Sequence, residues 1–199
     1  MYTGKQAADF TCAAVLESGE IIDQYNFYEK TKNQYALLFF YPLDFTFVCP
    51  TEMIALHKRM KAFKELNTRV ITVSIDSQFT HQRWRQTAVN DGGIGKVDYV
   101  MAADVSHQIC QAYGVQHATD SVAYRASIII DTNKVIRAKY VNDLPIGRNI
   151  DELLRTVQAL QYIEKHGEVC QAGWQSGDTG FQADARGVRK FLIEEAEQL

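Results

Sequence analysis

Hydrophobic residues occur along the chain in two different spacings that alternate. The run from Tyr35 to Tyr41 is apolar throughout, which is typical of a strand buried on both faces of a sheet. From Thr51 the apolar positions have a helical spacing, and those on one helix face are Met53, Leu56, Met60 and Phe63. A buried strand is therefore expected to lead, through a short loop, into an amphipathic helix.

The same alternation predicts the rest of the core. Further strands are expected at 69–76, 99–103, 124–131 and 135–141, and shorter helices at 81–89 and 106–113. Asp131 to Lys134 is a turn sequence, so the last two strands should form a hairpin. A long helix follows, with an apolar face made of Ile150, Leu153, Leu154, Val157, Leu160 and Ile163. This order predicts an α/β fold, a three-layer domain with a mixed central β-sheet.

The character of the chain changes after Gly167. Residues 167–185 are rich in Gly, Gln, Ser, Asp and Ala and have little periodicity, and a short helix is expected at 185–196. We therefore predict a domain at 1–166 and an extended C-terminal arm, with its short helix, at 167–199.

Charge and composition exclude several classes of protein. The chain has 199 residues and a formal net charge of −3, without the basic excess typical of nucleic-acid binding. The longest apolar stretch, Tyr35 to Leu43, contains Pro42 and is far shorter than the roughly 18 residues of a membrane span. The opening residues lack the apolar core of a signal peptide, so a cytoplasmic location is expected, with no nucleic-acid or membrane partner.

The four cysteines are Cys12, Cys49, Cys110 and Cys170. They are too few for a disulfide scaffold in a chain of this length, and without an export signal reduced thiols are expected. A disulfide between any two of them would more naturally be catalytic than structural.

Cys49 has the strongest candidate chemistry. It falls where the buried strand gives way to the amphipathic helix, and Pro50 suits the first turn of that helix. Active sites form at the carboxyl ends of strands in open α/β sheets, and a helix N-terminus favours the thiolate, which is the nucleophile. Glu52 stands where a Cys-x-x-Cys motif would have its second cysteine, which excludes an ordinary dithiol site here. The competing interpretation is a small buried core residue.

The segment Pro42-x-x-x-Thr46-x-x-Cys49 resembles the active-site motif of peroxiredoxins, and Phe40 to Glu52 is similar to the typical 2-Cys subgroup. The resemblance extends from about Phe10 to Trp174. Further segments that carry it, in family order, are Ala103 to His107, Tyr113 to Val115, Ala123 to Arg125, Asn142 to Arg148 and His166 to Cys170.

This resemblance implies a thioredoxin-like fold and a role for each matching residue. Cys49 would be the peroxidatic cysteine, Thr46 would hydrogen-bond the peroxide and the sulfur, and Pro42 would shield the pocket from water. Arg125 would direct its guanidinium at the thiolate, and Glu52 and Arg148 would orient Arg125. The competing interpretation of Arg125 is an ordinary surface arginine, although its place before an apolar run favours burial.

The resemblance also implies the reaction. The thiolate would reduce hydrogen peroxide or an organic hydroperoxide and become a sulfenic acid, which Cys170 of a second subunit would resolve as an intersubunit disulfide. A homodimer is implied, assembled further into a ring of dimers such as a decamer. Thioredoxin or a flavoprotein disulfide reductase would supply electrons, and no metal, haem or flavin cofactor is required.

The remaining cysteines, the histidines and one glycine-rich segment allow other interpretations. Cys12 and Cys110 are interpreted as packing residues, and the histidines have no zinc-ligand spacing. Gly92 to Gly95 resembles a segment of overoxidation-sensitive members, but Phe191-Leu192 stands where their Tyr-Phe pair would be. A chaperone or a redox sensor is a second hypothesis, and a thiol–disulfide oxidoreductase is a third.

Overall fold

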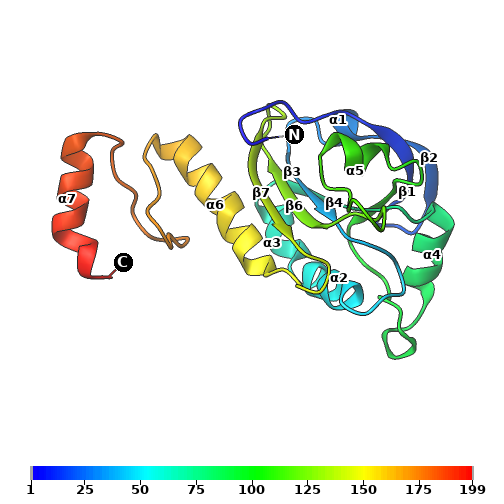
Figure 1. Cartoon of the computed structure of the whole chain (residues 1–199). Helices are drawn as coiled ribbons and strands as arrows, with labels where there is room; N and C mark the ends of the chain where they lie inside the picture. The colour runs from blue at the N-terminus through cyan, green and yellow to red at the C-terminus, as the bar shows by residue number, and fades with distance from the viewer. Residues whose placement is uncertain (1, 199) are drawn as a thin grey trace. The chain divides into compact units, whose positions relative to one another are not determined.

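The computed structural model describes residues 2–198, so residues 1 and 199, the outer ends of the two predicted domains, lie outside it. The strands are β1 (Thr11–Val15), β2 (Ile21–Asn26), β3 (Tyr35–Phe40), β4 (Thr68–Ser74), β5 (Val100–Ala103), β6 (Arg125–Ile130) and β7 (Ile136–Asn142). The α-helices are α1 (Phe27–Lys30), α2 (Cys49–His57), α3 (Met60–Glu65), α4 (Gln78–Gln86), α5 (Gln108–Ala112), α6 (Ile150–His166) and α7 (Ala185–Glu195) (Figure 1).

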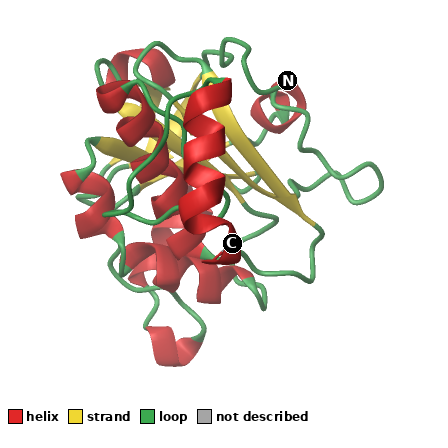
Figure 2. Cartoon of the chain, turned by 90° about the vertical axis from the view of Figure 1, so that its left-hand side faces the viewer, coloured by secondary structure: helices red, strands yellow, loops and turns green. Residues whose placement is uncertain are grey.

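All seven described strands belong to one mixed sheet with the order β2-β1-β5-β4-β3-β6-β7. Figure 2 shows strands in yellow and helices in red. Strand β3 is parallel to β4 and antiparallel to β6, and β6 and β7 form the predicted antiparallel hairpin. The predicted α/β class with a mixed central sheet is confirmed. Strand β3 lies between β4 and β6 in the interior of the sheet, and every residue from Ala36 to Phe40 is fully buried.

Alternate residues of the central strands face two separate layers. Leu38 and Phe40 point into the core that includes α1 and α5. Leu37 and Phe39 point to the opposite face, together with the residues that pair with Phe39 on the neighbouring strands, Thr72 and Ser127. Tyr41 continues this second face and stacks on Trp84 of α4. The functional residues described below lie on this second face.

The helix predicted from Thr51 is two helices, α2 and α3. Arg59 has φ −104° and ψ 1°, which ends the regular α-helical backbone between them. The apolar positions that predicted one helix are nevertheless all buried, and these are Met53, Leu56, Met60 and Phe63. The spacing of the apolar residues thus predicted the buried face correctly, but it did not predict that the helix is interrupted at Arg59.

The glycine-rich segment after α4 forms a tight turn. Gly92 has φ +82°, in the left-handed region that favours glycine. A Cβ on Gly93 would lie 2.0 Å from the Thr87 carbonyl oxygen, so only glycine fits against that backbone.

The chain forms two compact units, one ending at Ile150 and one beginning at Asp151. Helix α6 therefore lies with the C-terminal segment, whereas the predicted domain boundary falls after it, at 166/167. Compactness alone does not define a folding domain, so that boundary stays a prediction. No helix among residues 2–198 is long and apolar enough to cross a membrane.

Candidate active site

Cys49 is the first residue of α2, as its position before Pro50 predicts. Its side chain is fully buried, and β3 ends nine positions earlier at Phe40 (49 − 40 = 9). The sulfur therefore lies at the N-terminal end of a helix, whose dipole favours an anion, near the carboxyl end of a central strand.

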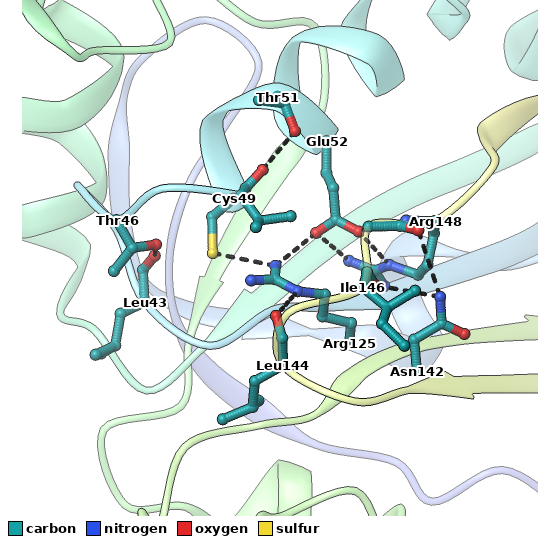
Figure 3. A network of polar contacts seen from close by, with 12 residues as sticks. Leu43, Thr46, Cys49, Thr51, Glu52, Arg125, Asn142, Leu144, Ile146 and Arg148 are labelled. Carbon is teal, nitrogen blue, oxygen red and sulfur yellow. Dashed lines mark hydrogen bonds and ion pairs between the residues drawn. The ribbon is translucent and has the colours of Figure 1, made fainter.

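Arg125, the first residue of β6, brings a positive charge to this sulfur (Figure 3). Its Nη1 donates to Cys49 Sγ at 3.3 Å and to Glu52 Oε2 at 2.8 Å, and its Nε donates to the carbonyl oxygen of Leu144. Its Nη2 has no hydrogen-bond partner among the described residues. Arg125 is 4% exposed, so it is a buried, paired arginine and not an ordinary surface residue.

Glu52 is held by two arginines. Arg148 Nε lies 2.9 Å from Glu52 Oε1, Arg148 Nη2 lies 3.0 Å from Oε2, and the Arg148 backbone N–H donates to Oε1 at 2.9 Å. Burial alone would raise the pKa of Glu52, but the hydrogen bonds and charge of Arg148, together with Arg125, outweigh burial and lower it. Glu52 is thus an anion that fixes both guanidinium groups.

The charges of this cluster do not balance without the sulfur. Arg125 and Arg148 contribute two positive charges and Glu52 contributes one negative charge, and all three side chains are at most 5% exposed. Because an uncompensated buried charge is costly, the remaining positive charge favours an anion at the atom that Arg125 contacts. That atom is Cys49 Sγ, so the arrangement favours the thiolate.

The loop before α2 holds Thr46 on the side of the Cys49 sulfur, and Pro42 precedes it in the same loop (Figure 3). Pro42 is buried, and Thr46 is half-buried. The Thr46 hydroxyl donates to the Leu43 carbonyl oxygen at 2.9 Å (Figure 3). In this arrangement its single proton is engaged, so toward an incoming O–H group Thr46 acts as an acceptor, whereas the sequence analysis assigned it hydrogen bonds to both the peroxide and the sulfur.

A second buried polar network, which the sequence analysis did not predict, holds this loop. Asp44 accepts from Tyr41 Oη at 2.6 Å and lies 2.8 Å from His81 Nδ1, and its backbone N–H donates to Asp76 at 2.9 Å. Burial, followed by the charge of Asp44, raises the pKa of Asp76. The ligand atoms of Asp44, Asp76 and His81 lie within 4.8 Å of one another, a spacing that a metal ion would fit, but these hydrogen bonds already use them. Sequence spacing gave no indication of this network, because its members come from separate elements.

The other two cysteines of the first unit pack in the core. Cys110 is 1% exposed, and Cys12 packs against the same core cluster, which confirms the packing interpretation. Burial, followed by the charge of Asp104, raises the pKa of each thiol to about 12. Neither thiol is therefore a nucleophile at neutral pH.

Cys170 lies in the second unit and is half-buried there. Its neighbour Val169 forms an isolated antiparallel bridge with Phe181, and Tyr162 Oη donates to Glu168 at 2.6 Å. Burial raises the pKa of Cys170, and the positive charge of Arg155 partly offsets this effect. All four cysteines are free thiols.

Two family models match the chain. The model of the AhpC/TSA family matches residues 3–139, and the model described as the C-terminal domain of 1-Cys peroxiredoxin matches residues 159–193.

Known proteins resemble the chain over nearly its whole length. It is 47% identical over 186 residues to alkyl hydroperoxide reductase C of Buchnera aphidicola subsp. Baizongia pistaciae (strain Bp), covering 94% of each chain. It is 45% identical over 199 residues to alkyl hydroperoxide reductase C of Helicobacter pylori (strain ATCC 700392 / 26695), covering 100% of each. The crystal structure of reduced Plasmodium vivax 2-Cys peroxiredoxin superposes with a TM-score of 0.93 at 40% identity, covering 97% of this chain and 99% of that one.

Proposed function

Because the chain belongs to the AhpC/TSA family of peroxiredoxins, we propose that Cys49 is the nucleophile of a thiol-dependent peroxidase. The protein is a peroxidase oxidoreductase of this family. The observation that carries the assignment of Cys49 is the 3.3 Å contact between Arg125 Nη1 and Cys49 Sγ, in a buried cluster of two arginines and one carboxylate.

The first step uses only side chains of the first unit. The Cys49 thiolate attacks one peroxide oxygen, the O–O bond breaks, and the leaving oxygen takes a proton and departs as water or an alcohol. The sulfur is oxidised to a sulfenic acid, and the peroxide is reduced by two electrons. Arg125 Nη2, free of protein partners among the described residues, donates to the oxygen on which negative charge develops, while Thr46 accepts from the peroxide O–H.

The second step requires another thiol. Condensation of the Cys49 sulfenic acid with the Cys170 thiol forms a disulfide and releases water. Cys170 is the proposed resolving cysteine, as the family resemblance implies, and the packing of Cys12 and Cys110 in the core supports this choice. We propose that this disulfide joins Cys49 of one subunit to Cys170 of its partner in a homodimer, as the resemblance to peroxiredoxins implies.

Larger assembly and the electron donor extend the same proposal. We propose a ring of dimers, a decamer, and an external reductant that is thioredoxin or a dedicated flavoprotein disulfide reductase. Sedimentation velocity would test the ring, since a species no larger than a dimer across the micromolar range would contradict it. Peroxide consumption with each reductase system, measured side by side, would identify the donor.

The cytoplasm is the proposed location, since it is a compartment in which four unpaired thiols stay reduced. Fractionation of the producing cells would test this, and recovery of the protein outside the cytoplasm would contradict it.

The decisive test of the proposed function is Cys49→Ser. A serine hydroxyl in this place is not ionised, so peroxide turnover is expected to fall to background, whereas the matched variant Cys110→Ser should retain turnover. Activity of Cys49→Ser at the wild-type level would overturn the assignment.

Cys170→Ser tests the second step separately. One peroxide equivalent should still be consumed per Cys49, as a single turnover, while the disulfide-linked dimer disappears from a non-reducing gel. If oxidised wild-type protein migrates only as a monomer, the intersubunit disulfide is wrong even though Cys49 is the nucleophile.

A further inference from the structure

One aromatic side chain contacts the arginine cluster from the sheet. Phe39 lies on β3, is fully buried, and presents the face of its ring to Arg148, whose Cζ lies 3.3 Å from the ring centroid. The neighbouring Phe40 is equally buried but points to the other core, where its ring lies 5.6 Å from that of Tyr113. The two residues thus occupy opposite faces of the same strand.

Hydrogen bonds fix Arg148 along the edges of its guanidinium group. Nε and Nη2 donate to the Glu52 carboxylate, and Nη1 donates to the Ala126 carbonyl oxygen at 2.7 Å and to Ser127 Oγ at 3.2 Å. Such bonds lie roughly in the plane of the group and leave its two faces open. The ring of Phe39 covers one of these faces and opposes tilting of the plane.

We infer that Phe39 is a positioning residue for the reaction at Cys49, because its ring holds the guanidinium of Arg148 in the plane that fixes Glu52 and, through it, Arg125. The inference rests on the proposed function of Cys49. The chain of contacts is continuous, since Glu52 accepts from both arginines and Arg125 reaches the sulfur at 3.3 Å.

The environment makes this ring contact strong. The side chain of Arg148 is 3% exposed, so it has lost nearly all of its hydration. Burial lowers the pKa of Arg148, which shows that its surroundings disfavour the cation unless partners compensate. The electron-rich face of an aromatic ring attracts a cation most where water is excluded, and a leucine of similar bulk would not.

The competing interpretation is that Phe39 only fills space in the core. The pair Phe39→Leu and Phe40→Leu separates the two interpretations, because both substitutions remove the same atoms from fully buried positions of one strand. Unfolding by urea would report the loss of packing in each variant. Alkylation of Cys49 by iodoacetamide, followed by peptide mass spectrometry across the pH range, needs no peroxide. Its rate depends on exposure and ionisation of the sulfur, and the midpoint of its pH profile reports the ionisation.

We expect Phe39→Leu to slow alkylation of Cys49 at pH 7 by about tenfold and to move the midpoint of the pH profile upward by about one unit. Phe40→Leu should lose comparable stability and keep a wild-type profile. If the pH profiles of Cys49 alkylation are the same in Phe39→Leu and Phe40→Leu, whether or not they differ from the wild-type profile, the inference is overturned. Since alkylation needs no turnover, this result is independent of whether Cys49→Ser abolishes peroxidase activity.

A second measurement keeps the inference testable if Phe39→Leu does not fold. Fluorinated phenylalanines placed at position 39 keep nearly the same volume while they progressively withdraw electron density from the face of the ring. Alkylation of Cys49 at pH 7 should slow stepwise from phenylalanine to 4-fluoro- to 3,4,5-trifluorophenylalanine. A flat series would show that the face of the ring has no part in positioning Arg148.

Discussion

Cys49 and Cys110 occupy similar places in the backbone but have opposite electrostatic surroundings. Both lie in the first turn of a helix, α2 and α5, and both are almost fully buried. A guanidinium N–H points at Cys49 Sγ, whereas the Asp104 carboxylate caps the helix of Cys110, with its Oδ2 2.7 Å from the Cys110 backbone nitrogen. A position in the first turn of a helix therefore does not by itself make a thiol reactive, because burial and a nearby carboxylate raise the pKa of Cys110, whereas a guanidinium group contacts Cys49.

The largest expected effect follows from removing the positive charge at Cys49. Arg125→Met leaves Glu52 and Arg148 as a balanced pair, so the cluster no longer favours a thiolate. Peroxide reduction should fall by about 10²–10³-fold, the cost typical of losing one preorganised donor. Stopped-flow peroxide consumption would measure it, with Arg137→Met, a partly exposed arginine paired to Asp131, as the matched control. If both variants are equally active, the charge at Cys49 is not what distinguishes it from Cys110.

The second prediction concerns stability and its pH dependence. Glu52→Gln leaves two buried guanidinium groups without their shared anion, and this should cost about 3–5 kcal/mol of unfolding free energy at pH 7. The folded-state pKa of Glu52 is lowered from 4.5, so its contribution is fully present above about pH 4.5 and is lost as the pH falls through the lower folded value. Urea unfolding of both proteins should therefore give a difference that narrows on acidification. A difference that is constant with pH would contradict this assignment.

The same comparison shows what the sequence could and could not predict. The position of Cys49 between strand and helix and the burial of Arg125 beside an apolar run were predictable, because each depends on residues close in sequence. The residues that complete the site lie far apart in the chain, such as Asp44 beside His81 and Phe39 beneath Arg148. Their contacts arise from the alternation of side chains across a folded sheet, which spacing alone does not reveal.

The missed elements have local reasons. Strand β2 was not predicted because it lies at an edge of the sheet, where adjacent Asp23 and Gln24 are both exposed and break the alternation. Helix α1, Phe27–Lys30, is a single turn and too short to show a period. The interruption at Arg59 could not be predicted from the spacing, because the buried apolar residues of α2 and α3 continue one helical spacing across it.

A smaller effect is expected near Cys110. Asp104 accepts hydrogen bonds from the backbone N–H groups of Ile109 and Cys110 with its two oxygens, and Asp104→Asn, which has one acceptor oxygen, should cost about 1 kcal/mol through the loss of one bond. Its charge also contributes to the raised pKa of Cys110, about 12, although burial is the larger cause. Alkylation of Cys110 should therefore remain far slower than that of Cys49. Rapid alkylation of Cys110 in Asp104→Asn would show that the charge of Asp104, and not burial, is the larger cause of the raised pKa of Cys110.

The smallest expected effect is that of salt. The Arg125 side chain is 5% exposed, and buried pairs are screened much less than surface pairs. Alkylation of Cys49 should change by less than about twofold between about 50 mM and about 500 mM NaCl. A steep decline with salt would show that distant surface charges, rather than Arg125, set the reactivity of Cys49.

The burial of the Cys49 sulfur at the first residue of α2 has a consequence for the proposed disulfide. A thiol of another chain cannot reach a fully buried atom, so the sulfur must leave its place before a disulfide can form. In the proposed reaction, oxidation to a neutral sulfenic acid removes the negative charge that offsets the one positive charge left after Glu52 pairs with the two arginines. The attraction between the arginine cluster and Cys49 Sγ therefore depends on the oxidation state of the sulfur, and it is weaker after the peroxide has reacted than before.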